Sequence, residues 1–207
     1  MTSAPSQRAP SQRAPSQRAP SQRSLPEHAL LLRDFANTLD MDEGTDELSD
    51  PGSLVTWLGQ RGLIQTCPGD GAGQGADDAD LSAATSLRTS LRAAMGAHHD
   101  TPGPPSGIDA AAAGLPLRVS ESAGIPTLVP VETGIRGGLA RLAAAIVAST
   151  ADHSWERLKI CTEDACQWAF LDSSKNRSKH WCSMRECGNR AKTRAYRARR
   201  AARTAAG

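Results

Sequence analysis

Hydrophobic side chains recur at intervals of three and four residues along much of the chain, and this spacing predicts amphipathic helices. In the second of these helices, Asp50 is the expected N-cap, Pro51 the first helical residue and Gly62 the stop. Residues 108–113 predict a short helix, and residues 138–149 predict a longer one. The side chains that define the first three helices are, in turn, Leu31, Phe35 and Leu39; Leu54, Trp57 and Leu58; and Leu81, Ala84, Leu87, Leu91 and Met95.

Two short stretches, residues 115–119 and 127–131, have the composition of strands. Because Pro116, Pro126 and Pro130 cannot donate to a central sheet, they favour a short hairpin or edge strands. The predicted fold class is therefore α+β, with a mostly helical body and a small hairpin. Polar or Gly- and Pro-rich stretches separate the elements and predict loops at residues 46–53, 69–75 and 101–107.

The start of the chain carries a different pattern, in which Ala-Pro-Ser-Gln-Arg is repeated four times from Ala4 to Arg23. A proline at every fifth position blocks regular helix, and the repeats contain no large apolar side chain to bury. We expect residues 1–24 to form a disordered tail. Its arginines offer weak attraction to phosphates, but an inert extension is the simpler interpretation.

Composition narrows the class of protein. The sequence has no run of about eighteen apolar residues to span a membrane and no apolar h-region of a secretory signal, so we expect a cytoplasmic protein. In that reducing compartment, paired cysteines hold metal more often than they form disulfides. The sequence contains no Gly-rich phosphate-binding motif, no Gly-x-Ser-x-Gly and no His-Glu-x-x-His, and we therefore expect no enzyme.

Four cysteines near the C-terminus carry the strongest chemical signal: Cys161, Cys166, Cys182 and Cys187. They form two Cys-x4-Cys pairs separated by fifteen residues, a spacing that suits a closed tetrahedral zinc site. An iron–sulfur cluster and four unliganded core cysteines are the alternatives, and the polar flanking residues disfavour the second. We interpret His180 as a neighbour of the site or a phosphate contact rather than as a ligand.

The insert between the two cysteine pairs predicts a hairpin supported by the metal. Residues 167–172 alternate large and small side chains as a strand does, and after a polar turn residues 179–181 return toward the metal. Trp168, Phe170 and Trp181 are expected to pack around the site rather than to stack on bases. So small a module needs the metal for its stability.

Charge separates the chain into an acidic body and a basic end. Residues 24–150 contain seven arginines, no lysine and sixteen acidic residues, whereas residues 173–207 contain eleven basic residues and Glu186 alone. A basic segment on an acidic protein is typical of nucleic-acid binding. A solvated helix face, or a tail docked on its own acidic body, is the alternative.

The basic residues fall on a predicted last helix. A capping box from Ser183 starts this helix at about Met184, or it starts near Asn189. Cys187 then lies in the opening turn, where the positive helix end favours a thiolate, and Tyr196 is expected to pack back on the zinc module. The candidate phosphate contacts, of which one or two would read guanine edges, are Arg185, Arg190, Lys192, Arg194, Arg197, Arg199 and Arg200.

The second cysteine pair lies in a pattern that resembles the CGNR zinc-finger family. The matching residues are Trp181-Cys-Ser-Met184 and Cys187-Gly-Asn-Arg190-Ala-Lys192, together with Cys161-x4-Cys166, Trp168, Phe170 and Asp172. The chain departs from the family pattern at Ser173-Ser-Lys-Asn-Arg177, away from the cysteines. The resemblance implies a treble-clef-like zinc module, made of a hairpin and the basic helix, that binds DNA.

The body resembles the ABATE domain, which is usually found in front of this zinc finger. The matching stretches are Asp34-Phe-Ala-Asn-Thr-Leu39, Leu54-Val-Thr-Trp57-Leu58 and Gly62-Leu63. The two resemblances imply a bacterial regulator of transcription whose N-terminal domain senses a signal, such as a stress-related ligand. The predicted domains are the repeat tail (1–24), an ABATE-like helical domain (25–152) and a CGNR-type zinc finger with the basic helix (153–207).

Our leading hypothesis is a cytoplasmic, zinc-dependent DNA-binding regulator that works as a homodimer, because one small module covers few base pairs. RNA or ribosome binding through the same helix is a second hypothesis. A third is a small-molecule-binding protein whose zinc module is purely structural. Asp34, Asn37 and Trp57 are candidates to line an effector pocket, although a helix-packing role for the polar pair is the simpler interpretation.

Overall fold

The structure is a computed structural model that describes residues 25–65, 75–99 and 106–205. Its helices are α1 (Glu27–Ala36), α2 (Pro51–Gln60), α3 (Asp78–Ala97), α4 (Ile108–Ala112), α5 (Gly134–Ala151) and α6 (Asn189–Ala205), with a 3₁₀ turn η1 (Trp155–Arg157) and a π-helical turn η2 (Met184–Gly188). Its antiparallel sheets pair β1 (Leu39–Asp40) with β2 (Thr45–Asp46), β3 (Leu117–Ser122) with β4 (Ile125–Pro130), and β5 (Leu158–Ile160) with β6 (Ala169–Leu171). The α+β class is confirmed. The predicted repeat tail and most of the predicted loops at 69–75 and 101–107 lie outside the described residues.

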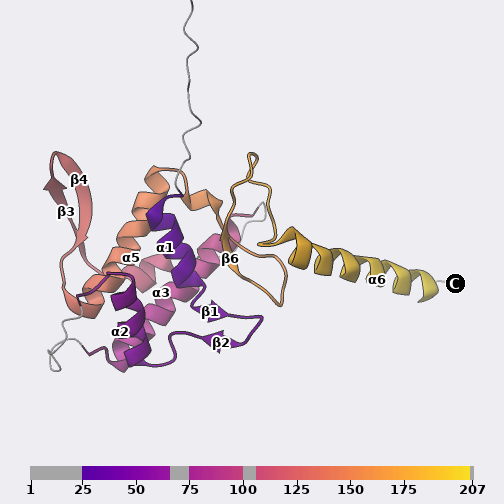
Figure 1. Cartoon of the computed structure of the whole chain (residues 1–207), viewed down its shortest axis with the longest axis horizontal. Coiled ribbons are helices and arrows are strands. Elements are labelled where there is room, and N and C mark those ends of the chain that lie inside the picture. Colours follow the sequence, from indigo (N-terminus) through magenta and orange to yellow (C-terminus); the bar gives the residue numbers. More distant parts are fainter. Residues whose placement is uncertain (1–24, 66–74, 100–105, 206–207) are drawn as a thin grey trace, which may run out of the picture.

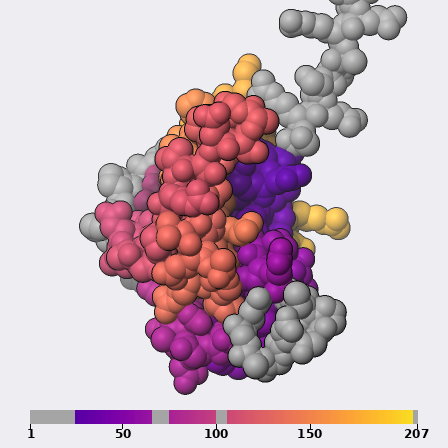
Figure 2. Space-filling view, turned by 90° about the vertical axis from the view of Figure 1, so that its left-hand side faces the viewer, coloured from indigo at the N-terminus to yellow at the C-terminus, as the bar shows by residue number. Residues whose placement is uncertain are grey.

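The helices form one body from which two elements project. Figure 1 shows α1, α2, α3 and α5 gathered together, with the β3–β4 hairpin standing out on one side and α6 extending away on the other. Figure 2, seen from the hairpin side, shows β3–β4 and α5 covering much of that face. Among the described residues, no helix is long and apolar enough to cross a membrane.

The core of the body is built from the predicted apolar helix faces. α1 packs against α5, α3 and β6, and its Leu32 and Phe35 are fully buried. Gly138 of α5 packs closely on the segment that follows α2, where a β-carbon would lie 2.8 Å from Ile64 and would force the two segments to shift. Of the apolar positions predicted for α2 and α3, Leu81 is half-buried. The others are buried: Leu54, Trp57, Leu58, Ala84, Leu87, Leu91 and Met95.

The first helix is shorter than its apolar spacing predicted. α1 ends at Ala36, and Leu39 lies in strand β1. The two residues after the helix are polar, and their side chains bind backbone groups there. Thr38 Oγ1 donates to the Phe35 carbonyl, and the Asn37 amide binds the backbone of β6.

The start and stop signals of α2 are confirmed. Asp50 is the N-cap, and its carboxylate accepts the Ser53 N–H at 2.9 Å while Ser53 Oγ accepts the Asp50 N–H at 3.1 Å. Pro51 occupies the first helical position. Gly62 follows the helix with a φ of +64°, a left-handed conformation that suits glycine.

The predicted hairpin is also confirmed, and its strands extend closer to the turn than predicted. β3 and β4 pair along their whole lengths around Ala123 and Gly124, which have φ values of 51° and 78°. Two positive φ values define the type I′ turn that suits the twist of a two-residue hairpin. Because the ribbon has only two strands, Pro126 and Pro130 always have an open edge beside them.

The strand after the first cysteine pair has a different partner from the one predicted. β6 pairs with β5, with Leu158 opposite Leu171 and Ile160 opposite Ala169, whereas residues 179–181 form no strand. Leu158 and Ala169 are fully buried in the main core. The pairing is therefore selected by burial against the helical body, which the alternation of residues 167–172 alone does not show.

Asn37 binds the outer edge of this small sheet. Its Oδ1 accepts the Ala169 N–H at 2.7 Å and its Nδ2 donates to the Ala169 carbonyl at 2.9 Å, as a neighbouring strand would. Arg92 of α3 donates to the carbonyls of Ala36 and Gln167 at 2.8 and 2.9 Å. These bonds join the helical body to the C-terminal segment.

We predict that Asn37→Ala lowers the free energy of unfolding by about 1–3 kcal/mol, because it leaves the buried N–H and carbonyl of Ala169 unpaired. Urea unfolding followed by circular dichroism measures the change. The exposed Asn176→Ala is the matched control and should change stability by less than about 0.5 kcal/mol. Equal loss of stability in the two variants would contradict the assignment.

Candidate metal centre

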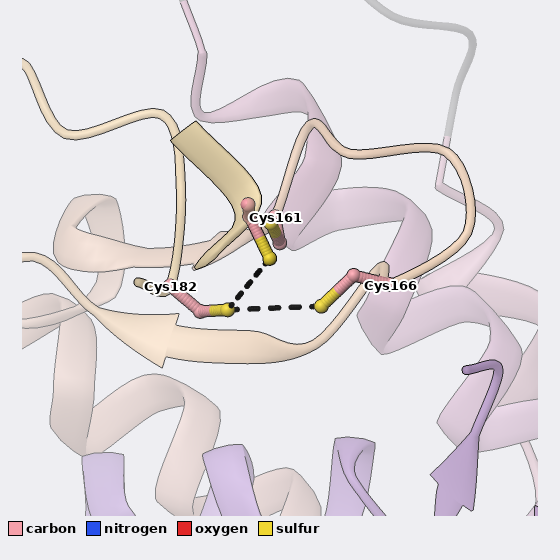
Figure 3. Close-up of side chains that lie close together, drawn as sticks. Cys161, Cys166 and Cys182 are labelled. Atoms are coloured by element: carbon pink, nitrogen blue, oxygen red, sulfur yellow. Dashed lines mark hydrogen bonds between the residues drawn. The ribbon is translucent and has the colours of Figure 1, made fainter. Parts of the chain in front are cut away.

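Four cysteine sulfurs converge in the C-terminal segment. The Sγ atoms of Cys161, Cys166, Cys182 and Cys187 all lie within 4.8 Å of one another, and Cys182 Sγ is 3.6 Å from Cys166 Sγ and 3.7 Å from Cys187 Sγ. Figure 3 shows the labelled side chains turned toward a common centre. Around a tetrahedral ion with metal–sulfur bonds of about 2.3 Å, neighbouring sulfurs lie about 3.8 Å apart. The donor set therefore fits a single metal ion.

Three separate segments supply the sulfurs. Cys161 follows β5, and Cys166 closes a turn that begins at Glu163, whose carbonyl accepts the Cys166 N–H at 2.9 Å. Cys182 precedes η2, and Cys187 lies within it. A metal ion at this centre would join the β5–β6 hairpin, the returning chain and the first turn of the basic helix.

Burial disfavours ionisation of the metal-free thiols. Cys161, Cys166 and Cys187 are buried, and Cys182 is half-buried. Desolvation, together with hydrogen bonding to Cys166, raises the pKa of Cys187 to about 11 and raises the pKa of Cys182 well above its ordinary range. Since thiolates are the metal-binding form, a bound cation would supply the positive charge that these packed sulfurs lack.

A buried ion pair holds the loop between the cysteine pairs. Lys159 Nζ donates to Asp172 Oδ2 at 3.1 Å and to the Arg177 carbonyl. Asp172 also accepts the N–H groups of Ser174 and Lys179, each at 2.9 Å. Burial by itself would raise the pKa of Asp172, but these hydrogen bonds outweigh it and lower the pKa to about 2.

Two of the three aromatic residues between the cysteine pairs pack on the site, as predicted. Phe170 is buried in the sulfur cluster and Trp181 packs against it. Trp168 is 37% exposed, so its predicted place in the core is wrong. Phe170 and Trp181 already cover the small cluster, and Trp168 lies one residue before β6 at the surface.

His180 lies beside the site, as expected, and its ring faces the helical body. It stacks on His99 with ring centroids 5.3 Å apart and planes 12° apart. His98 and His99, just after α3, donate to the carbonyls of Leu158 and Ile160 at 2.7 Å each. Among the described residues, no second group of cysteine, histidine or acidic side chains is placed to hold a metal ion.

The basic helix begins directly behind the fourth cysteine. Ser183 caps the π-helical turn η2, and α6 continues from Asn189, so the two predicted starts mark two successive geometries of one helix. Figure 1 shows α6 leaving the body as a single helix. Tyr196 is 60% exposed, and the prediction that it packs on the zinc module is wrong because the helix points away from that module.

The seven predicted nucleic-acid contacts divide into two groups. Arg190 pairs with Asp42 of the β1–β2 turn at 3.1 Å, and Arg194 pairs with Glu163 and, at 3.1 Å, with Asp164. Sequence reasoning missed these carboxylates, although two adjacent acidic residues between the first two cysteines were a signal. The other five predicted contacts have no carboxylate at ion-pair distance within the described part of the chain: Arg185, Lys192, Arg197, Arg199 and Arg200.

The three predicted pocket residues are not brought together. Trp57 lies in the main core, and Asn37 has the packing role described above. Asp34 and Asn37 border a recess of about 500 Å³ between α1 and β6, and Trp57 does not. Other side chains that line the recess are Arg33 and Arg61, which both pair with Asp34, and Trp168.

Two family models match the chain in neighbouring segments. Residues 29–154 match the ABATE model, described as a putative stress-induced transcription regulator. The chain belongs to the ABATE family. Residues 157–200 match the CGNR zinc finger, and this CGNR segment contains all four clustered cysteines and most of α6. Among curated proteins, none matches the chain.

The ABATE segment, residues 29–154, supports the metal centre directly. Its Asn37 binds β6, the strand that follows the first cysteine pair. Its two histidines after α3 bind β5, the strand that precedes this pair. The ABATE and CGNR segments are therefore packed together at the β5–β6 hairpin.

We predict that Cys166→Ser removes most of the bound metal, because three thiolates leave the tetrahedral site incomplete. Elemental analysis of the purified protein should give about one metal ion per chain for the wild type and far less for the variant. The fifth cysteine of the sequence, Cys67, offers the matched control, and Cys67→Ser should keep the metal. Equal metal content in both variants would refute the four-sulfur assignment.

We predict that Asp172→Asn destabilises the protein by about 3–5 kcal/mol, because the buried Lys159 ammonium loses its charge partner. A carboxyl pKa lowered to about 2 gives stability that is complete above the ordinary value near 4 and is lost as pH falls through 2. The difference in unfolding free energy between wild type and variant should therefore shrink from about pH 4 toward pH 2. The exposed Asp109→Asn, measured alongside by urea denaturation, should show no such pH-dependent difference.

Proposed function

We propose that the protein is a zinc-dependent DNA-binding regulator of transcription. The CGNR segment would bind DNA, and the ABATE segment would sense a signal or form the dimer. The observation that carries the proposal is a solvent-exposed, strongly basic helix placed directly behind a four-sulfur metal site. The family description of the ABATE segment supports the role in transcription.

Zinc is the metal that suits this donor set best. Four thiolates form a soft, tetrahedral set, and since all four positions come from the protein, none remains open for catalysis. An iron–sulfur cluster also uses four cysteines, but it spreads them around several iron atoms, whereas these sulfurs lie within 4.8 Å of one another. The role of zinc would be to fix Cys187 in η2 and thereby the direction of α6.

The dimensions of α6 suit the major groove of DNA. A helix is about 10–12 Å across with its side chains, and the major groove of B-DNA is about 12 Å wide. The helix has 17 residues, and its basic side chains lie on more than one face, so phosphates on both sides of the groove would be within reach. Neutralising them releases counterions, which drives association. Of the seven candidate contacts, five are free of ion pairs within the described residues: Arg185, Lys192, Arg197, Arg199 and Arg200. Arg190 and Arg194 would first have to leave their carboxylate partners.

RNA is the second candidate polyanion, because the same charges attract either nucleic acid. The major groove of A-form RNA is too deep and narrow for side chains to read. The projecting form of α6 therefore favours a DNA duplex. Competition between duplex DNA and structured RNA of equal charge distinguishes the two.

A dimer and an effector complete the proposal. One helix covers few base pairs, so two copies joined through the ABATE segment would supply the specificity that one lacks. The recess between α1 and β6 is the candidate effector site, because Asp34 of the ABATE segment and Trp168 of the CGNR segment both line it. A ligand there would contact the joint between the two segments.

We predict that affinity for a fixed duplex falls steeply with salt, with a log–log slope of about −0.9 for each phosphate contact. Arg199→Gln combined with Arg200→Gln should flatten the slope, whereas the matched pair Arg118→Gln and Arg141→Gln, on exposed arginines of the ABATE segment, should not. Cys187→Ser should weaken binding strongly because it frees the start of α6. Fluorescence anisotropy across a salt series measures all four proteins.

Two results would contradict the proposal. One is a flat salt dependence for the wild type, which would favour a small-molecule-binding protein whose zinc module is purely structural. In that case, reversing the α6 arginines to glutamate should leave the cellular phenotype intact. The other is equal binding by the wild type and Cys187→Ser, which would show that DNA binding does not depend on the metal site.

A further inference from the structure

Two arginines at the start of α6 are bound to carboxylates of the protein itself, and the two pairs differ in burial. Arg194 pairs with Glu163 of the CGNR segment, whose side chain is 3% exposed. Arg190 pairs with Asp42 of the ABATE segment, where the side chains are 48% and 42% exposed. The difference in burial gives the two pairs different roles.

Arg194 is a fixed anchor of the helix. Glu163 lies inside the first cysteine loop, and its second carboxyl oxygen, Oε2, is buried without a hydrogen-bond partner. If Arg194 moved to a phosphate, the buried Glu163 carboxylate would lose its principal compensating charge, which is strongly unfavourable. Asp164 holds the same guanidinium at 3.1 Å. Arg194 therefore positions α6 on the metal loop.

The Arg190–Asp42 pair is exchangeable. Both Asp42 oxygens lie 3.1–3.2 Å from Arg190 Nη1, and Oδ2 also lies 3.1 Å from Nη2. This forked contact is the one that a guanidinium makes with a phosphate. Because both side chains are open to solvent, the pair is weak and a competing anion can reach it.

The β1–β2 hairpin holds Asp42 in this position. Asp40 Oδ1 accepts the N–H groups of Asp42 and Glu43 at 2.9 and 3.0 Å, which braces the turn. On the returning strand, the two oxygens of Asp46 accept from the buried Arg88 of α3 at 2.6 and 2.7 Å. In Figure 1 the hairpin reaches from the body toward the start of α6.

We propose that Asp42 occupies the position of a DNA phosphate on Arg190, so that the ABATE hairpin competes with DNA for the first turn of the basic helix. The inference rests on the DNA-binding function proposed above. A duplex seated on α6 would displace the carboxylate and separate the hairpin from the helix. By the same equilibrium, a hairpin held on Arg190 weakens DNA binding.

The test compares Asp42→Asn with Glu43→Gln, which removes the same charge from the neighbouring residue of the same exposed turn. Among the described residues, Glu43 has no basic partner at ion-pair distance. Asp42→Asn should tighten duplex binding by up to about fivefold, the range of an exposed ion pair. The salt slope should stay close to that of the wild type, because Arg190 contacts the same phosphate in both complexes. Glu43→Gln should change the affinity much less.

A double-mutant cycle with Arg190→Gln makes the assignment specific. In the Arg190→Gln background, Asp42→Asn should tighten duplex binding no more than Glu43→Gln does. The inference is overturned if wild type binds with a steep slope and Asp42→Asn behaves as Glu43→Gln does, or binds more weakly. If neither wild type nor Asp42→Asn shows salt-dependent binding, the DNA-binding function fails, and the competition fails with it.

Discussion

The C-terminal segment has almost no apolar core of its own. Around the four sulfurs, its buried cluster consists of Cys161, Cys166, Phe170 and Cys187, with Trp181 and Cys182 packed against them. Burying so little apolar surface does not offset the conformational entropy lost when the segment is ordered. The segment therefore depends on two supports outside its own apolar side chains, a metal ion at the sulfurs and the helical body behind the hairpin.

The two supports act on opposite faces of one small sheet. Successive side chains of a strand point to opposite sides, and in β6 Phe170 joins the sulfur cluster while Ala169 joins the main core. Asn37 and the histidines after α3 bind the backbone of the same two strands. A shift of the ABATE helices would consequently move the strand that carries the cysteine loop. Loss of metal, by contrast, would release α6 and leave the helical core intact.

Local signals explain what the sequence predicted. The Asp50–Pro51 start of α2, the buried faces of α2 and α3, and the Cys-x4-Cys spacing each depend on residues close together in the chain. Long-range choices were not predictable in this way. The alternation of residues 167–172 predicts a strand but does not predict that it pairs with β5. That pairing depends on the burial of Leu158 against helices distant in sequence.

The same limit applies to the candidate site. The spacing of the four cysteines predicted a common metal site, and their sulfurs do converge. The exposure of Trp168 and Tyr196 depends on where the body ends and on the direction in which α6 leaves it. The partners of Arg190 and Arg194 come from Asp42 and from the cysteine loop, so a charge pattern read along one helix could not identify them.

The stability of the helix α6 depends on where opposite charges offset the repulsion between its arginines. Like charges four residues apart repel, as in Arg190 with Arg194 and in Arg199 with Arg203. At the first pair, carboxylates of the protein remove the repulsion. At Arg199 and Arg203, no carboxylate of the described residues lies at ion-pair distance. There, the helix-favouring alanines between the basic residues are the main local support. If the proposed DNA binding holds, phosphates would compensate the charges of the outer turns as Asp42 and Glu163 compensate those of the first turn, and binding would further stabilise the outer helix.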